Sequence, residues 1–429
     1  MKKKVLIITY YWPPSAGSGV QRWLKFAKYL PQFDWEPVIF TPENPDFDLQ
    51  DESLLAEVSG DLEVIKFPIW EPYQLLNKIR GKKEAHPARV MDQSAKSWIE
   101  KASIWARANL LVPDPRVFWV KPSVKFLFEL VRQGQFQAII TTGPPHSMHL
   151  IGKALKEKYQ IPWIADFRDP WSEWEFLDTL PMNARIRKKH QKLEQEVLQQ
   201  SDAVLTISPT FQANLSRLSG REIKLLTNGY DPSDLPVGFE KKKKEPKTFH
   251  LVYTGIIDAI RNPIPLLKAF KEEFGETGEE VKFSFVGRVS DTVRDYVKAD
   301  DWLSQKVEFP GYVAHEEVFS FYAQADALVL ILTNTKNAKG NIPGKLFEYM
   351  STGIPILALG DPKGDSAKIL KSAKAGAVYA HSDFAGIQVG LRKMAEGESG
   401  ESSQHEINQY SRENLAKSLA QILDESTLS

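Results

Sequence analysis

Strand-like apolar runs, each followed by a turn and a helical pattern, recur along the chain and constrain its fold more than any other feature. Val5 to Thr9 is the first such run, and it is rich in β-branched residues without an alternation of apolar and polar positions. A strand of this kind suits a parallel sheet that is covered on both faces. Phe249 to Thr254 starts a second series. The pattern therefore predicts an α/β protein with doubly wound sheets.

The length of the chain leaves room for more than one domain. Its 429 residues are enough for two or three domains of ordinary size. A strong turn signal at Thr227 to Pro232 is followed by a charged stretch at 240–247, which we interpret as a solvated linker. We therefore predict an N-terminal domain over residues 1–232 and a C-terminal domain over residues 245–407, with a last helix in residues 408–429.

The stretch from Gly340 to Pro355 is the strongest candidate for a binding site. A predicted buried strand at 327–332 precedes it, and glycines and a proline break the chain before a helical pattern begins. Lys345 stands at the N-terminus of that helix, where unpaired N–H groups and the helix dipole favour a phosphate. Glu348 follows one turn later, and its carboxylate is suited to accept hydrogen bonds from sugar hydroxyls. An ordinary Lys–Glu pair on a helix surface is the alternative interpretation.

A glycine-rich turn follows the first predicted strand. Gly17 and Gly19 precede a helical pattern that starts near Val20 and contains Arg22. Glycines let the backbone approach a ligand closely, and the helix N-terminus behind them favours an anion. A tight turn explains the same glycines equally well, so both interpretations stay open.

Charged residues also follow the predicted strand at 161–165. Asp166 and Arg168 lie in the sequence Asp-Phe-Arg-Asp-Pro-Trp. Open α/β sheets place their ligands at this end of their strands, although structural ion pairing explains the same residues. His146 and His149 follow the preceding predicted strand, and a histidine on an apolar helix more often packs than reacts.

The run from Pro343 to Met350, with Gly353 and Pro355 behind it, resembles the donor-site signature of family-four glycosyltransferases. The resemblance covers nearly the whole chain and implies a glycosyltransferase type B fold, in which two Rossmann-like domains face each other across a cleft. It also implies that the last helix, in residues 408–429, crosses back onto the N-terminal domain. It implies transfer from a nucleotide-diphosphate sugar to an acceptor hydroxyl with retention of configuration. The sequences Pro-Pro-His-Ser and Asp-Phe-Arg-Asp-Pro-Trp resemble a subgroup that acts on lipid-linked sugars in polysaccharide assembly.

The resemblance also implies roles for individual residues. Lys345 is expected to hold the diphosphate and Glu348 the ribose. Gly340 stands where the family commonly has a Glu that contacts the sugar. The family also has an Arg and, several residues later, a Lys that hold the diphosphate; Ile256 stands in place of the Arg, and Arg261 is expected to replace the Lys, so one of the two cations is missing. The other expected donor contacts are Gly17, Gly19, Gly255, Arg288, Tyr312, Asn341, Ile342 and Gly344, and those expected on the acceptor side are Asp166, Arg168 and His146.

Residues 69–120 depart from the alternation of strands and helices and form a predicted helical insertion. Aromatic residues such as Trp98 and Trp105 are interleaved there with basic residues such as Lys82 and Lys83. One interpretation is a helical layer that buries its aromatic side chains. The other is an acceptor or membrane surface, since aromatic rings favour the lipid interface and each Lys or Arg near an anionic leaflet adds about 1 kcal/mol.

Composition narrows the classes of partner. Lys and Arg balance Asp and Glu at 55 each, so there is no global field of the kind that nucleic-acid binding requires. The absence of Cys excludes thiolate chemistry and favours a reducing compartment. The apolar run near the N-terminus is shorter than a signal peptide needs. We expect a cytoplasmic protein, either free or peripheral at the inner membrane face, with no metal and no cofactor besides the donor substrate.

Two further hypotheses remain open at this stage. A nucleotide-sugar epimerase of the same architecture would release an altered donor in the absence of any acceptor. A non-catalytic partner, with Gly340 and Ile256 as marks of a lost site, would bind a nucleotide sugar without turnover. Product analysis with and without an acceptor separates these hypotheses from a transferase.

Overall fold

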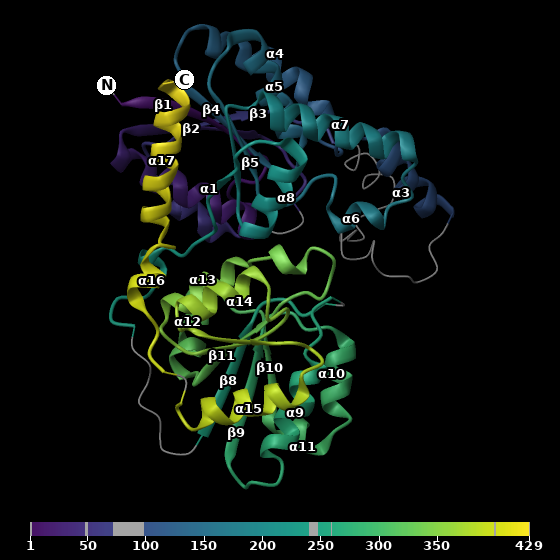
Figure 1. The fold of residues 1–429 in the computed structure, drawn as a ribbon, viewed down its shortest axis with the longest axis vertical. Coiled ribbons are helices and arrows are strands. Elements are labelled where there is room, and N and C mark those ends of the chain that lie inside the picture. The colour runs from purple at the N-terminus through teal and green to yellow at the C-terminus, as the bar shows by residue number, and fades with distance from the viewer. Residues whose placement is uncertain are drawn as a thin grey trace. The chain divides into compact units, whose positions relative to one another are not determined.

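The structure is a computed structural model, and it describes residues 2–47, 50–71, 98–239, 248–258, 260–398 and 400–428. The chain divides into two compact units, and each is an α/β domain (Figure 1). The first unit, here unit 1, comprises Met1–Thr227 and Glu413–Ser429, and unit 2 comprises Asn228–Arg412. Part of the predicted insertion, including Lys82 and Lys83, lies outside the described residues, as does the predicted linker at 240–247.

Unit 1 contains a parallel sheet whose strand order, among the described residues, is β3-β2-β1-β4-β5-β6-β7. Its strands are β1 (Lys3–Ile8), β2 (Trp35–Pro42), β3 (Glu63–Phe67), β4 (Ala138–Gly143), β5 (Trp163–Phe167), β6 (Ala203–Thr206) and β7 (Lys224–Leu225). Its helices are α1 (Ser18–Tyr29), α3 (Trp98–Leu110), α4 (Val117–Arg132), α5 (Ser147–Tyr159), α6 (Glu175–Asp178), α7 (Ala184–Gln200), α8 (Pro209–Ser219) and α17 (Arg412–Leu428). The order reverses between β1 and β4, so this pair marks the topological switch point.

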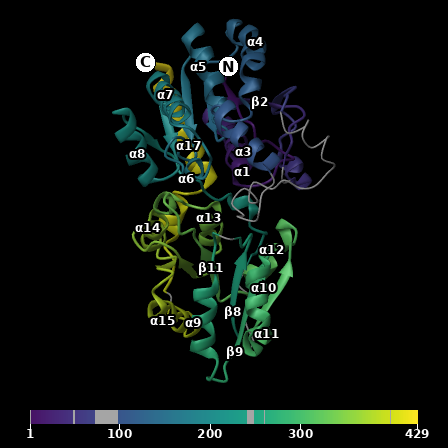
Figure 2. The ribbon, with the colours of Figure 1, turned by 90° about the vertical axis from the view of Figure 1, so that its right-hand side faces the viewer.

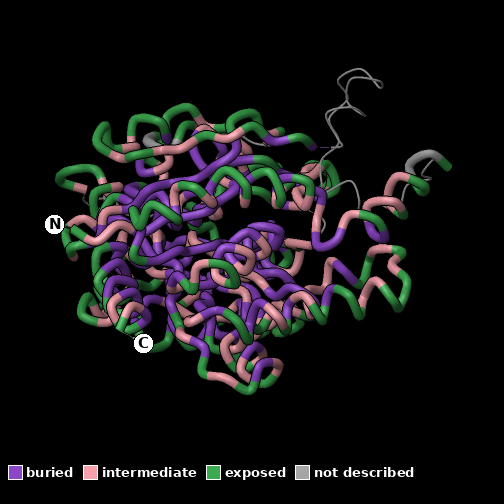
Figure 3. Tube along the Cα trace, turned by 90° about the horizontal axis from the view of Figure 1, so that it is seen from above, coloured by how far each residue is buried: buried purple, intermediate pink, exposed green. Residues whose placement is uncertain are grey.

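Strand β1 shows why the sheet is covered on both sides. Val5 and Ile7 belong to one hydrophobic cluster, which includes residues of α1 and α17. Leu6 and Ile8 belong to another cluster, which includes residues of α4, α5 and α7. Because successive side chains of a strand point to opposite faces, an uninterrupted apolar run supplies both clusters. Figure 3 shows the resulting distribution, with buried segments inside and exposed loops around them.

Helix α17 completes unit 1 from the far end of the chain. Leu419 and Leu423 are fully buried in the cluster that α17 shares with α1. The Asp424 carboxylate accepts hydrogen bonds from Lys3 Nζ at 2.5 Å and from Trp35 Nε1 at 2.9 Å. The last helix therefore contributes side chains to the hydrophobic core of unit 1 and is hydrogen-bonded to residues of β1 and β2.

Unit 2 contains a second parallel sheet, of order β10-β9-β8-β11-β12-β13 among the described residues. Its strands are β8 (Thr248–Thr254), β9 (Glu280–Val286), β10 (Val307–Gly311), β11 (Ala327–Ile331), β12 (Ile356–Leu359) and β13 (Gly376–Tyr379). Its helices are α9 (Ile264–Phe274), α10 (Asp291–Lys298), α11 (Asp301–Lys306), α12 (His315–Gln324), α13 (Gly344–Ser351), α14 (Asp365–Ser372), α15 (Phe384–Ala395) and α16 (Gln404–Asn408). Helices α9 and α15 lie side by side on one face (Figures 1 and 2), and the switch point lies between β8 and β11.

The predicted fold class is confirmed by these two sheets. The described part of the insertion is helical, as predicted. The expectation that its aromatic side chains are buried fits Trp119, which is 1% exposed, but it is wrong for Trp70, Trp98 and Trp105, which are 55%, 78% and 50% exposed. No helix in the described part of the chain is long and apolar enough to span a membrane.

The packing of α17 predicts unequal effects of two substitutions in the same helix. Leu423→Ala should lower the free energy of unfolding by about 2 to 5 kcal/mol, because it empties a fully buried site. Leu428→Ala is the matched control, since this side chain is 89% exposed. Urea unfolding followed by tryptophan fluorescence measures both. Equal losses in the two variants would contradict the docking of α17 on unit 1.

Candidate functional site

The carboxyl end of β8 in unit 2 is built around two glycines. Gly255 has φ +122°, and a Cβ on it would lie 1.7 Å from Lys345 Nζ. Gly287 has φ +123°, and a Cβ on it would lie 2.2 Å from the Gly255 carbonyl oxygen. Both the backbone conformation and the close packing therefore require glycine. As a result, the Lys345 ammonium lies directly against the end of β8.

Lys345 occupies the second position of α13 and is half-buried. Its Nζ donates a hydrogen bond to the Thr254 carbonyl and lies 5.7 Å from the centre of the Tyr253 ring. Burial lowers the pKa of Lys345 to about 8, the nearby Glu348 carboxylate opposes this shift, and Arg261 adds to it. An ammonium with a lowered pKa gains more from an anionic partner than a solvated one does. The site is therefore suited to an anion.

Glu348 is held by a directed chain of hydrogen bonds. The Thr254 N–H donates to the Tyr349 hydroxyl at 3.0 Å, and that hydroxyl is also hydrogen-bonded to Thr254 Oγ1 at 2.9 Å. Thr254 Oγ1 in turn lies 3.0 Å from the Tyr322 hydroxyl, which donates to Glu348 Oε1 at 2.5 Å. Burial raises the pKa of Tyr322 well above its ordinary value, so this hydroxyl keeps its proton. One oxygen of Glu348 is thereby fixed and the other is available to a ligand.

The remaining residues proposed for unit 2 differ in their environment. Arg261 forms an ion pair with Asp258, with 2.7 Å between Nη1 and Oδ2. Ile342 is 2% exposed, so its side chain is not accessible to a ligand. The others lie at strand ends or in the loop before α13: Arg288 after β9, Tyr312 after β10, Gly340 in a short turn, Asn341 beside it and Gly344 at the start of α13. The structure thus brings Gly255, Lys345 and Glu348 together and leaves Tyr312, at 82% exposed, on the surface.

Asp166, at the end of β5 in unit 1, is enclosed by donors from the protein itself. Arg22 donates to both carboxylate oxygens, from Nε at 3.1 Å and from Nη2 at 2.9 Å. Trp23 Nε1 and Thr142 Oγ1 donate to Oδ2, each at 3.0 Å. The side chains of Arg22 and Asp166 are fully buried. This arrangement makes Asp166 a residue that holds the ends of β4 and β5 to α1.

Arg168 brings a cation to the glycine-rich turn. Its Nη2 donates to the Pro144 carbonyl, and its Nη1 would lie 2.5 Å from a Cβ on Gly19. Burial lowers the pKa of Arg168, and Asp169 and Asp166 oppose that shift. Gly19 is therefore needed to admit the guanidinium, whereas a Cβ on Gly17 would meet nothing within 4 Å.

His146 and His149 lie at the start of α5, beside the end of β4. His146 stacks on Trp171 with 4.7 Å between ring centres, and His149 stacks on Phe167 at 4.6 Å. Burial lowers the pKa of His149 to about 3 and that of His146 well below its ordinary value. A Cβ on Gly143 would lie 2.8 Å from His146 Nδ1 and 2.6 Å from His149 Nε2. Two neutral rings therefore fill the space beside Gly143.

Thr141 links His149 to a neighbouring indole. The Trp163 indole N–H can only donate, and it donates to Thr141 Oγ1 at 2.8 Å. His149 Nδ1 lies 2.9 Å from the same oxygen and shares a hydrogen bond with it. The other ring nitrogen, Nε2, is buried and has no hydrogen-bond partner among the described residues.

The close packing at Gly255 predicts how a substitution there affects anion binding. Gly255→Ala should displace the Lys345 ammonium, because the new Cβ would occupy its position. Inorganic pyrophosphate should then bind about as weakly as it does to Lys345→Ala, a loss of roughly one to two orders of magnitude for one charge-assisted contact. Combining both substitutions should add no further loss. Isothermal titration calorimetry measures these affinities.

Gly353→Ala is the matched control for this experiment. Gly353 also has a positive φ, of +69°, but a Cβ on it would meet nothing within 4 Å. Its substitution also strains the backbone, although less than at φ +122°, and it should not move Lys345. Full pyrophosphate affinity in Gly255→Ala would rule out the proposed contact between the ammonium and the ligand.

The sequence of residues 248–396 matches the family described as glycosyl transferases group 1. No curated protein sequence matches the chain. The fold is similar to that of sucrose-phosphate synthase from Thermosynechococcus elongatus, with a TM-score of 0.62 and 14% identity over 99% of both chains. It is also similar to Anabaena HepE in complex with UDP and glucose, with a TM-score of 0.60 and 13% identity over 99% of this chain and 100% of that chain.

A third similar structure is the lipopolysaccharide outer core galactosyltransferase WaaB, with a TM-score of 0.59 and 12% identity over 99% of both chains. At such low identity these similarities concern the fold alone. The family match adds chemistry, because it spans β8 to α15 and includes Gly255, Lys345 and Glu348. Unit 2 therefore contains a glycosyl transferase group 1 domain, and the chain is a glycosyltransferase.

Proposed function

We propose that this glycosyltransferase takes its sugar from a nucleotide-diphosphate donor bound at the carboxyl ends of β8 and β11. The observation that carries the proposal is the half-buried Lys345 ammonium, held against Gly255 one turn before the oriented Glu348 carboxylate. Anabaena HepE, a protein of similar fold, has been crystallised with UDP and with UDP-glucose. A diphosphate would neutralise Lys345, and ribose hydroxyls would donate to Glu348.

Transfer with retention of configuration is part of this proposal. The acceptor hydroxyl attacks C1 of the sugar on the face from which the diphosphate leaves, and the bond between C1 and the phosphate oxygen breaks. The proton of the hydroxyl passes to the leaving phosphate oxygen. Lys345 stabilises the negative charge that develops on that phosphate, and Arg261 assists if it exchanges Asp258 for the ligand. No carboxylate nucleophile and no metal ion is required.

The proposal extends to the acceptor, which we take to be a sugar or lipid-linked sugar in cell-surface polysaccharide assembly. The similar structure WaaB is described as a lipopolysaccharide outer core galactosyltransferase. Gly340 provides no side chain to contact the donor sugar.

Donor affinity should depend on pH through Lys345. Its pKa of about 8 in the free protein rises when a diphosphate binds, so the affinity is highest below pH 8 and falls above it. UDP-glucose should bind roughly tenfold more weakly at pH 9 than at pH 7 if one proton is taken up with a pKa near 8. Calorimetric titration at several pH values measures this profile.

Two variants test whether Lys345 causes the pH dependence. Lys345→Ala should bind more weakly at every pH and show a flat profile apart from any titration of the ligand. Lys345→Arg retains its charge at pH 9, so its affinity should also be independent of pH over this range. A tenfold loss between pH 7 and pH 9 that persists in Lys345→Ala would assign the titration to another group.

We also propose that the exposed aromatic side chains of unit 1 bring the protein to an anionic membrane surface. Trp70 and Phe118 contact each other edge to face at 4.9 Å, yet they are 55% and 45% exposed. Trp98 and Trp105 are exposed on α3, and the exposed Lys101 lies on the same helix. Aromatic rings and basic side chains together favour the headgroup region of an anionic bilayer.

Sedimentation with vesicles tests this membrane proposal. The protein should bind vesicles that contain phosphatidylglycerol and not neutral ones, and high salt should release it. Lys101→Glu with Lys121→Glu should weaken binding at least tenfold, since each basic residue near the surface contributes roughly 1 kcal/mol. Lys298→Glu with Lys371→Glu makes the same change of charge at exposed positions of unit 2 and is the control. Equal recovery in the supernatant with both lipids would exclude the membrane surface.

A further inference from the structure

Lys345 and Glu348 have opposite charges and lie three residues apart on α13, yet no ion pair joins these two described residues. Residues at this spacing are neighbours on the surface of a helix, where a Lys and a Glu can form a salt bridge. Both side chains are half-buried, and a salt bridge there would be stronger than one in water. Each side chain is instead hydrogen-bonded to another group of unit 2.

Tyr322, on α12, is the residue that holds Glu348. The hydroxyl of Tyr322 lies 2.5 Å from Glu348 Oε1. A phenol has one proton and a carboxylate only accepts, so Tyr322 donates this bond. The Thr254 hydroxyl, 3.0 Å from the Tyr322 oxygen, then donates to it, and the Tyr349 hydroxyl donates to Thr254 Oγ1 at 2.9 Å. Because Tyr322 and Tyr349 are fully buried, packing fixes the positions of their hydroxyl groups.

Thr254, the last residue of β8, takes part in holding both charged side chains. Its carbonyl oxygen accepts a hydrogen bond from Lys345 Nζ. Its hydroxyl donates to Tyr322, which in turn donates to Glu348. One residue at the carboxyl edge of the sheet therefore gives Lys345 and Glu348 separate partners.

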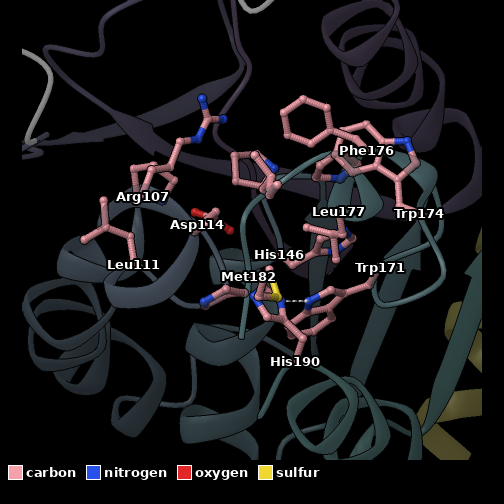
Figure 4. Close-up of a pocket in the computed structure, with 16 residues that line it drawn as sticks. Arg107, Leu111, Asp114, His146, Trp171, Trp174, Phe176, Leu177, Met182 and His190 are labelled. Carbon is pink, nitrogen blue, oxygen red and sulfur yellow. Dashed lines mark hydrogen bonds between the residues drawn. The ribbon is translucent and has the colours of Figure 1, made fainter. Parts of the chain in front are cut away.

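A buried hydrogen bond in unit 1 shows how this arrangement differs from ordinary core packing. Trp171 Nε1 donates to His190 Nδ1 at 3.0 Å, the dashed bond in Figure 4, and both residues are buried. That bond can only stabilise the fold. Glu348, by contrast, is half-buried, and its Oε2 has no partner among the described residues and is not one of the buried unpaired atoms. Tyr322 therefore fixes a carboxylate whose second oxygen is accessible.

We propose that Tyr322 is a positioning residue that keeps Glu348 from pairing with Lys345, so that Glu348 can accept from the ribose of the donor and Lys345 can bind the diphosphate. The separation of the charges follows from contacts within unit 2, and their use by a ligand rests on the proposed function. Without the Tyr322 hydroxyl, the carboxylate is free to turn toward the ammonium. Each charge would then neutralise the other, and a nucleotide would have to break the ion pair in order to bind.

The titration of Lys345 reports on this separation in the absence of any ligand. Burial lowers the pKa of Lys345 to about 8, the Glu348 carboxylate opposes the shift, and Arg261, itself paired with Asp258, adds to it. The Tyr253 ring, 5.7 Å from Nζ, is the aromatic neighbour. A carboxylate in direct contact with an ammonium favours the charged form and so raises its pKa. Any change that lets the ion pair form should therefore move the titration to higher pH.

NMR titration of the full chain with isotope-labelled lysine tests the proposal. The Lys345 signal, assigned by its loss in Lys345→Arg, should titrate near pH 8 in the parent protein. In Tyr322→Phe it should titrate roughly one pH unit or more higher. Adding Glu348→Gln to Tyr322→Phe should abolish this increase, because the ion pair needs the carboxylate. Tyr230→Phe is the matched control, since it removes a buried hydroxyl that donates to Asn408 Oδ1 at 3.2 Å, and it should leave the titration unchanged.

Calorimetry with UDP and with its analogue that lacks both ribose hydroxyls tests the effect on a ligand. The parent protein should bind UDP roughly tenfold more tightly than the analogue, as expected for hydrogen bonds to a carboxylate. In Tyr322→Phe this ratio should fall to about two or less, because Glu348 is engaged by Lys345. A purely structural role of Tyr322 would weaken both ligands equally and leave the ratio unchanged.

Two results would overturn the proposal: an unchanged Lys345 titration in Tyr322→Phe, or an unchanged ratio of the two affinities. If Tyr322→Phe does not fold, Thr254→Val decides by the same two criteria, because it removes the hydroxyl that donates to Tyr322. Failure of the parent protein to bind UDP, together with the upward shift of the Lys345 titration, would count against the proposed donor site. That result would leave the separation of the two charges standing.

Discussion

The two sheets of this protein each hold a cation at their carboxyl edge, fully buried in unit 1 and half-buried in unit 2, and the structure depends on how each charge is balanced. In unit 1 the Arg22 guanidinium forms a fully buried ion pair with Asp166, and further donors from Trp23 and Thr142 complete the carboxylate. Removing one member of such a pair leaves an uncompensated buried charge, which costs about 3 to 5 kcal/mol. In unit 2 the Lys345 ammonium donates to a carbonyl, and its pKa falls to about 8. Unit 1 supplies its own anion, whereas unit 2 is suited to receive one.

Glycines at the strand ends make this arrangement possible, because they have no Cβ atom. The room this leaves is filled by other side chains of the protein. A Cβ on Gly255 would meet the Lys345 ammonium, and one on Gly19 would meet the Arg168 guanidinium. A Cβ on Gly143 would meet the two imidazole rings of α5. The interpretation of Gly17 and Gly19 as a ligand-binding turn therefore needs refinement. At Gly19 the close approach is made by the protein's own cation, and a ligand that binds there would meet Arg168.

The sequence predicted the features that depend on local pattern and missed those that depend on tertiary contact. Apolar runs at 5–9, 161–165, 249–254 and 327–332 predicted β1, β5, β8 and β11, whereas β12 and β13 were not predicted. Lys345 and Glu348 were identified because a helix N-terminus is visible in sequence. Tyr322 was not, because its hydroxyl reaches Glu348 only when α12 packs beside α13. Burial of the insertion was equally invisible, since Trp119 is buried and Trp98 is exposed in the same aromatic-rich segment.

The electrostatic contrast between the units bears on which substrate each one binds. A diphosphate is negatively charged. If it bound at the end of β5 in unit 1, it would lie near the Asp166 carboxylate, and the Arg22 cation there is already paired with that carboxylate. Burial also keeps His146 and His149 uncharged, so these rings add no attraction for an anion. Lys345, by contrast, gains charge stabilisation from the same diphosphate. In the proposed reaction, charge therefore assigns the donor to unit 2.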